Sequence, residues 1–319
     1  MLLRTVLRRI GYALLTMLLA SLLVFTALQA LPGDLATQLL GRDATPSAVA
    51  QLRATLHLDR PAWRRYLDWL GGALHGDFGR SLVSHQAVLD EAGRYLRNTA
   101  LLAAIVIVAG ITLSLALGVV AGLLRDRWPD LTISGLSLIG MSVPEFTVST
   151  LLVLVFAVRL GWFPAVVTDG PDASVGELTH VIWLPAAALT IVMAAYIIRM
   201  MRTSVIDVLG SEYVTAARIR GLSGGRVLFR HALPNALLPT LNVIAINIAW
   251  LVGGVVVVES IFNYPGIGTL MLRSVHDRDL PVLQFIAVLG AATFVVCNLL
   301  ADFAATWLNP RLRTPGRAG

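Results

Sequence analysis

The side chains of this sequence that could do chemistry are few and far apart. The six histidines show no spacing that would place metal ligands together on one helix. They are His57, His75, His85, His180, His231 and His276. The single cysteine, Cys297, lies inside an apolar run, so an internal disulfide is ruled out. The sequence contains no nucleophile elbow and no paired-carboxylate motif, which predicts a chain that is not itself an enzyme.

The composition indicates an all-α membrane protein. Of the 319 residues, 56% are hydrophobic and only 14% are charged, against about 25% charged in a typical soluble domain. Such a chain cannot hide its apolar surface in one globular core. The sequence pI is about 10.2, but the arginines cluster at the ends of apolar runs. There they contact membrane lipid and set the topology, so we expect no nucleic-acid partner.

Two acidic residues lie within the apolar runs, where a carboxylate is costly and often functional. Glu145 follows Pro144 inside one run, and Asp302 lies toward the predicted cytoplasmic end of another. The Pro-Glu pair predicts a kink with a polar group that faces a cavity or a partner. Glu145 is therefore a candidate for a pathway through the membrane. The alternative, that Glu145 only stabilises the kink, is equally compatible with the sequence.

The segment Ser211–Pro234 is the longest strongly polar interruption in the C-terminal half of the chain. Ser211 can cap a helix, and Glu212 then lies at the positive end of the helix dipole. Gly221 stands where a left-handed residue ends a helix. Ser223 can cap a second short helix, which Pro234 is expected to end. The sequence predicts helix, turn and helix between two membrane spans.

The spacing of small residues in this segment resembles the coupling loop of the membrane subunits of ABC importers. That pattern is Glu-Ala-Ala, three residues, Gly, nine residues, Ile, any residue, Leu-Pro. This sequence has Ala216-Ala217, then Gly221, then Leu233-Pro234, with Thr215 in place of the Glu and His231 in place of the Ile. The longer string from Tyr213 to Pro239 resembles the dipeptide, oligopeptide and nickel permease branch. Short phrases in residues 31–79 resemble the N-terminal region of the same branch.

The resemblance implies a permease subunit of a binding-protein-dependent ABC importer in the cytoplasmic (inner) membrane, working by alternating access. It also implies a second homologous permease, two ABC ATPase subunits or domains and an external solute-binding protein as partners. The residues expected to couple the chain to the ATPases are Glu212, Ala216, Ala217, Gly221, Leu233 and Pro234. The carried solute is expected to be a dipeptide, an oligopeptide or a related small solute, such as a nickel chelate or a glutathione-like molecule.

One short motif points to a different role and is rejected. Leu222-Ser223-Gly224-Gly225 matches the core of the ABC ATPase signature. An ATPase also needs a phosphate-binding loop that ends in Gly-Lys-Ser/Thr, and this sequence contains no lysine. We therefore expect the chain to bind no cofactor, with ATP and magnesium bound by the partner ATPase subunits.

The apolar runs predict six transmembrane helices in the type I ABC importer permease fold, with both termini in the cytoplasm. Residues 1–31 form the first span, and residues 32–98 form an external helical segment. Residues 99–308 form a domain of five spans that contains a cytoplasmic coupling loop at 199–234. Residues 309–319 form a cytoplasmic tail. The predicted spans are Ile10–Leu31, Thr99–Leu124, Leu131–Val158, Val181–Ile198, Ala236–Val258 and Pro281–Trp307.

A secondary carrier or channel without an ATPase is the main alternative. Such a carrier would use ionisable groups in mid-membrane, for which Glu145 and Asp302 are the only candidates. A carrier has no reason to keep an ATPase-docking helix, so the loop around Ala216, Ala217 and Gly221 favours the importer.

Overall fold

The computed structural model describes residues 2–29, 37, 40, 44–55 and 58–308. Within these residues the regular secondary structure is helical, as predicted, apart from an isolated β-bridge between Arg80 and Ala87. The chain divides into two compact units. Unit 1 consists of Met1–Arg97 and Gly266–Val295, and unit 2 consists of Asn98–Pro265 and Val296–Gly319. The predicted tail at 309–319, residues 30–31 of the predicted first span, and His57 lie outside the described residues.

Four helices of the described chain are long and apolar enough to cross a membrane, and two bent helix pairs raise that number to as many as six. The four are Val88–Leu123, Trp183–Leu209, Gly224–Leu251 and Leu280–Cys297; the pairs are Trp128–Ser142 with Glu145–Arg159 and Gly253–Phe262 with Ile267–His276. The predicted first span corresponds to α1 (Leu2–Gln29), a helix of 28 residues that contains the apolar stretch Leu14–Ala27. At about 1.5 Å per residue, a helix of this length exceeds the roughly 30 Å of a hydrocarbon core.

Unit 1 contains the predicted external segment. Helices α3 (Pro46–Thr55) and α4 (Ala62–Leu74) occupy the two stretches in which the sequence showed helical periodicity. Helices α13 (Ile267–His276) and α14 (Leu280–Leu308) follow later in the chain, and α14 passes on into unit 2. The unit packs around a small apolar core that includes Val88, Ala92, Tyr95, Leu270, Val282, Phe285 and Ile286. Beside it, the buried Asp279 accepts hydrogen bonds from the Ser81 hydroxyl and from the Leu82 backbone N–H.

Unit 2 is built around α9 (Trp183–Leu209), which supplies fourteen buried residues. Helix α5 (Val88–Leu123) packs closely against α9 through two glycines. A Cβ at Gly118 would lie 2.6 Å from Met201 Cβ, and a Cβ at Gly122 would lie 2.7 Å from Val205 Cβ. Only a residue without a side chain fits at such a distance. The G-x-x-x-G pair Gly118 and Gly122 therefore allows the close contact between α5 and α9.

The predicted third span is sharply bent. Helix α6 (Trp128–Ser142) ends before Pro144, and α7 (Glu145–Leu152) leaves at 110° to it, followed by the π-helix η2 (Val153–Arg159). Val143 is extended, because a residue before proline is driven out of the helical region. The predicted kink is confirmed, but its angle makes the pair a broken span or a re-entrant segment rather than one continuous helix.

The segment between the predicted spans Leu131–Val158 and Val181–Ile198 contains a helix, α8 (Val175–Val181), that the sequence analysis did not anticipate. Its start is a capping box, in which the Ser174 hydroxyl accepts from the Glu177 N–H while the Glu177 carboxylate accepts from the Ser174 N–H. These hydrogen bonds lower the pKa of Glu177. The loop is thus ordered by local bonds as well as by its contact with the core.

Candidate functional site

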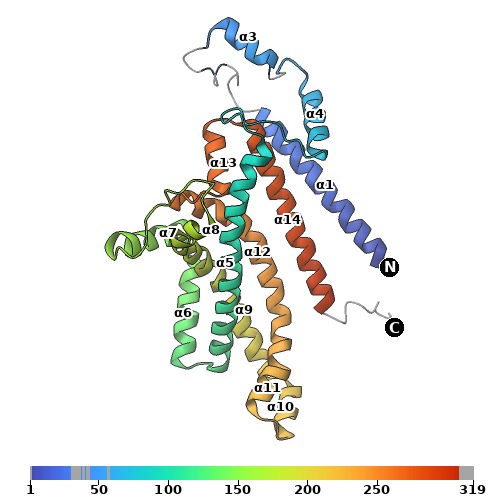
Figure 1. Ribbon diagram of the computed structural model, residues 1–319. Helices are drawn as coiled ribbons and strands as arrows, with labels where there is room; N and C mark the ends of the chain where they lie inside the picture. Colours follow the sequence, from blue (N-terminus) through green and yellow to red (C-terminus); the bar gives the residue numbers. More distant parts are fainter. Residues whose placement is uncertain (1, 30–36, 38–39, 41–43, 56–57, 309–319) are drawn as a thin grey trace. The chain divides into compact units, whose positions relative to one another are not determined.

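The polar segment singled out in the sequence forms a helix-turn-helix, here called the coupling segment (residues 211–232). Helix α10 (Glu212–Ile219) is followed by α11 (Gly224–Val227) and by the π-helix η3 (Leu228–Ala232). Figure 1 shows α10 and α11 beyond the lower ends of α9 and α12 (Leu233–Phe262). The predicted fourth span ends at Ile198, whereas α9 continues to Leu209, so the first eleven residues of the predicted loop 199–234 are helical.

Ser211 precedes α10 in the extended conformation expected at a helix start, but it does not make the predicted cap. Its hydroxyl donates instead to the carbonyl oxygen of Val208, 2.5 Å away, in the last turn of α9. Ser211 therefore ties the end of α9 to the start of α10. Glu212 lies in the first turn of α10, as predicted, where its charge complements the helix dipole.

The turn after α10 is the one that the sequence predicted. Gly221 has a φ of +79°, in the left-handed region that glycine tolerates best. Its N–H donates to Arg218 O at 2.9 Å, and the Leu222 N–H donates to Ala217 O at 3.3 Å. This pair of bonds closes the C-terminus of α10 as a Schellman motif and turns the chain toward α11.

The two adjacent alanines of the segment face in different directions. Ala217 is 8% exposed and packs with the buried Val214 and Val227. Partly buried residues complete this group, which we call the α10 core: Val208, Leu209 and Leu222. Ala216 is exposed. The prediction grouped both alanines as one contact surface, but only Ala216 is free to meet another protein.

The outward side of α10 carries an exposed apolar residue on a segment that the sequence places in water. Glu212, Thr215, Ala216 and Ile219 are all exposed, and their spacing of three and four residues puts them on one helix face. We call this set the outer face of α10. The Ile219 side chain is 82% exposed.

Pro234 does not end the second helix, contrary to the prediction. It lies in the first turn of α12, and the chain from Gly224 to Leu251 is one helical stretch. Proline has no N–H, and its ring collides with the carbonyl four residues back in a regular helix. The wider turns of the π-helix Leu228–Ala232 just before it relieve that conflict. Leu233 packs beside Met201 at the junction with α9, while Pro234 is exposed.

Glu145, the predicted membrane-embedded acid, lies at the first position of α7, next to the 110° bend. Its Oε2 atom is buried and has no hydrogen-bond partner. The backbone of α12 passes beside it, since a Cβ at Gly254 would lie 3.0 Å from Oε2 and 3.0 Å from the Trp250 ring. The structure therefore places an unsatisfied carboxylate oxygen at the break in the α6–α7 pair.

A buried ion pair that the sequence analysis missed ties α6 to α9. Asp130 is fully buried and binds Arg202 through both carboxylate oxygens, with Arg202 Nη2 2.7 Å from Oδ2. The carboxylate also accepts from the Asp126 N–H and the Ser134 hydroxyl. Nothing in the local sequence pairs these residues, because they lie 72 positions apart. The fully buried Glu259 was missed in the same way; its carboxylate accepts a 2.6 Å hydrogen bond from the Thr99 hydroxyl.

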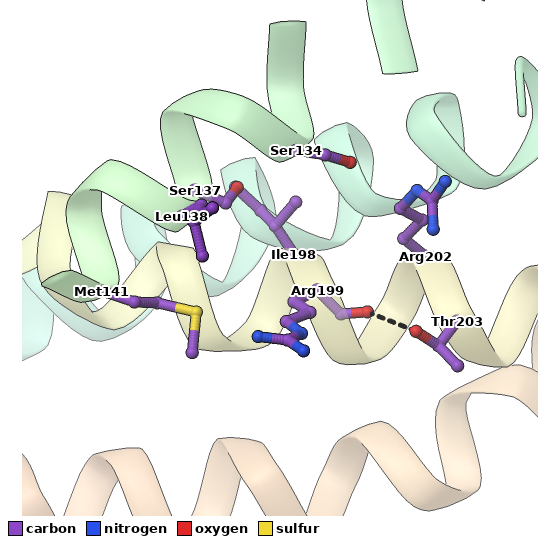
Figure 2. A pocket seen from close by; sticks show the side chains of 8 residues that line it. All are labelled: Ser134, Ser137, Leu138, Met141, Ile198, Arg199, Arg202 and Thr203. Carbon is purple, nitrogen blue, oxygen red and sulfur yellow. Dashed lines mark hydrogen bonds between the residues drawn. The ribbon is translucent and has the colours of Figure 1, made fainter. Parts of the chain in front are cut away.

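A pocket of about 400 Å³ opens beside this ion pair, between α6 and α9 (Figure 2). Arg199 and Thr203 of α9 line it together with Ser134, Ser137 and Met141 of α6. Arg199 is exposed, and no described carboxylate pairs with it, whereas Arg202 is neutralised by Asp130. The pocket thus has one free positive charge at its lining. Within the described residues, no group of three His, Cys, Asp or Glu side chains is placed to hold a metal.

Comparison with known proteins matches the whole length of the described helices. Residues 110–314 match the family described as binding-protein-dependent transport system inner membrane component, and residues 2–116 match the N-terminal family of the same components. A relative from Brucella abortus (strain 2308), named a peptide transport system permease protein, is 37% identical over 309 residues, or 97% of this chain and 98% of the relative. The glutathione transport system permease protein GsiC of Escherichia coli (strain K12) is 35% identical over 298 residues, or 93% of this chain and 95% of the relative.

Proposed function

This chain belongs to the family of binding-protein-dependent transport system inner membrane components, the permeases of ABC importers, and we propose that it carries peptides or related small solutes across the cytoplasmic membrane. The named transport roles of the Brucella and Escherichia coli relatives support a peptide-like solute. A secondary carrier or channel is not favoured, since both relatives are permease components of transport systems. Both termini are proposed to lie in the cytoplasm, as the arginine-rich short loops indicate.

The observation that carries this proposal is the outer face of α10. Ile219 is 82% exposed there, and Tyr213 and Phe229 of the same segment are 45% and 70% exposed, so the coupling segment offers several apolar side chains to a partner. An ATPase subunit with an apolar cleft would cover Ile219 and Ala216, and Glu212 would lie at the rim of that contact. Ala217 and Gly221 then act indirectly, because they hold the shape of the segment that presents this face.

The connections of the coupling segment suit it for transmitting motion. Helix α9 enters it with only Gly210 and Ser211 between α9 and α10, and α12 leaves it without a break after η3. A displacement of α10 by ATPase closure is therefore passed to two long helices rather than absorbed in a flexible loop. Leu233 and Pro234 lie at the junction through which α12 would be moved. Alternating access would follow from the swing of these helices.

The remaining partners follow from the family rather than from contacts of this chain. We propose two ATPase subunits or domains that bind ATP and magnesium, a second homologous permease, and an external solute-binding protein. The chain itself would bind no nucleotide, which agrees with the lack of any lysine for a phosphate-binding loop.

The docking role is tested by co-purification of ATPase subunits from native membranes with a tagged form of this chain. Wild-type protein should retain the ATPases, and Ala216→Glu should lose at least about nine tenths of them, because an ionised side chain must be desolvated at the contact. Val175→Glu, on the exposed side of α8, is the matched control and should retain them. Absence of ATPase from wild type, or full retention by Ala216→Glu, would refute the proposal.

We also propose that Glu145 faces the solute pathway. Its unsatisfied Oε2 at a break between membrane helices is suited to accept a hydrogen bond or a positive charge from a passing polar solute. Glu145→Gln should lower the uptake rate several-fold in reconstituted transporter and leave ATPase co-purification unchanged. If Glu145 only stabilises the kink, both the folded yield and the ATPase retention would fall together with uptake.

A further inference from the structure

A pocket in unit 1 carries donor groups that none of the roles above uses. It has a volume of about 230 Å³ and lies between α4, the end of α1 and the start of α14. Its polar lining comes from Arg65, Asp68, Trp69, Gln29 and Gln284. All of these residues lie within one compact unit.

Two hydrogen-bond donors at this pocket have no acceptor. Arg65 Nε and Trp69 Nε1 are both buried, and neither has a hydrogen-bond partner in the structure. The two residues are four positions apart on α4, so they share one face of the helix. A buried donor without an acceptor is rare in folded proteins, so these two groups are suited to bind an acceptor that enters the pocket. Because both side chains line the pocket, an acceptor would have to come from it.

The charge of Arg65 is also uncompensated within the described chain. Its Nη2 donates to the neutral Gln29 Oε1 at 2.6 Å, and no described carboxylate pairs with it. Partial burial lowers the pKa of the Arg65 guanidinium. Asp68 also lines the pocket, and its ion pair with Arg60 at 3.2 Å offsets its negative charge. The pocket therefore favours an anion with several acceptor oxygens over a cation or an apolar ligand.

The position of the pocket indicates that such an anion would come from the membrane surface. Leu280 and Pro281 in its lining are the first residues of the apolar helix Leu280–Cys297, so this wall lies where a membrane-crossing helix begins. On the other side of the pocket, Phe25 is in the apolar part of α1. Trp63 and Leu67 on α4 are more than half exposed, as expected for a helix that rests on a membrane surface. The boundary between lipid and water is the level of phospholipid phosphates.

We propose that this pocket binds the phosphodiester group of a membrane phospholipid, with Arg65 and Trp69 as the donors. The planar guanidinium can give two parallel hydrogen bonds to phosphate oxygens, and the indole N–H can give a third. The pocket volume suits a phosphate and its neighbouring glycerol carbons, and the acyl chains would run outside it along the apolar helices. The bound headgroup would brace α4 against α1 and α14.

Native mass spectrometry of the full-length chain, released from detergent micelles, tests this site with three probes. They are palmitoyl-oleoyl phosphatidylglycerol, the matching diacylglycerol without phosphate, and inorganic phosphate. Wild-type protein should retain phosphatidylglycerol in preference to both other probes. Arg65→Gln should bind it about tenfold more weakly, and Trp69→Phe should show a smaller loss.

The neighbouring Arg64 provides the matched control. It is exposed, stacks over the Trp63 ring at 5.1 Å and does not line the pocket, so Arg64→Gln should bind the lipid as wild type does. Equal losses in Arg64→Gln and Arg65→Gln would overturn the proposal in favour of general surface charge. Retention of inorganic phosphate as strong as that of the lipid would also overturn it. If Arg65→Gln fails to fold, Arg65→Lys and Trp69→Phe test the site in its place. Unchanged lipid retention by both variants would contradict the proposal.

Discussion

Unit 2 holds its helices together in two contrasting ways near the coupling segment. At the start of α6, the fully buried Asp130 accepts hydrogen bonds from Arg202 Nε and Nη2 and from the Ser134 hydroxyl. Both of its carboxylate oxygens are therefore satisfied within the chain. The coupling segment is held instead by the small apolar α10 core, and it leaves Ile219 82% exposed. The polar groups of the Asp130 site are paired within the chain, whereas the coupling segment exposes a large apolar side chain to solvent.

The difference separates structural residues from contact residues more clearly than the sequence could. A buried and saturated ion pair fixes two helices relative to each other, and it tolerates the loss of neither partner. A short helix that rests on a few apolar contacts can be built to meet a partner, because its outer face is not needed for its own fold. The same comparison explains why Ala216 and Ala217, adjacent in the sequence, should respond differently to the same substitution.

The largest effect is expected from Ala217→Glu, which places a charge in the α10 core among Val214 and Val227. We expect it to destabilise the coupling segment by more than about 3 kcal/mol, whereas Ala216→Glu leaves the segment folded. The four arginines of the segment make trypsin a direct probe. Local unfolding in Ala217→Glu should speed cleavage at least about tenfold over wild type. Equal cleavage rates in the two variants would show that Ala216 and Ala217 do not differ in burial.

The ion pair should respond next most strongly. Asp130→Asn leaves the Arg202 guanidinium, 27% exposed, without its counter-charge, for an expected loss of about 3–5 kcal/mol. The double variant Asp130→Leu with Arg202→Met removes both charges and should recover most of that loss. Thermal unfolding of the purified chain in detergent measures both the loss of stability in the single variant and its recovery in the double variant. A wild-type melting temperature for Asp130→Asn would mean that this region is not held by the pair.

The smallest effect is expected at the turn. Gly221→Ala adds a Cβ that meets nothing within 4 Å, so only the strain of a φ of +79° remains. We expect a loss of about 1 kcal/mol and a modest decrease in uptake, with the ATPases still retained. A fall in uptake as large as that of Ala217→Glu, measured in the same assay, would place Gly221 in the docking contact itself.

Local signals in the sequence predicted the parts of the fold that local physics determines. The glycine turn at Gly221 and the kink at Pro144 each follow from the backbone conformation that glycine or proline favours. The direction of Ala217 could not be predicted, because α10 has only eight residues and both alanines are equally small. Asp130 and Arg202 carry no local pattern. The helix continues past Pro234 because the wider turns of the π-helix Leu228–Ala232 accommodate the proline, and no sequence pattern marks a π-helix there.

The central claim is that the outer face of α10, and not its inner face, meets an ATPase subunit. The direct measurement is thiol cross-linking in native membranes, with Ile219→Cys and Val227→Cys compared in a background where Cys297 is replaced by serine. Ile219 is 82% exposed and Val227 is 1% exposed, so the pair isolates orientation within one segment. The account predicts a cross-link to an ATPase subunit from position 219 and none from position 227. A cross-link from 227 but not 219, or from neither position in a complex that still transports, would contradict it.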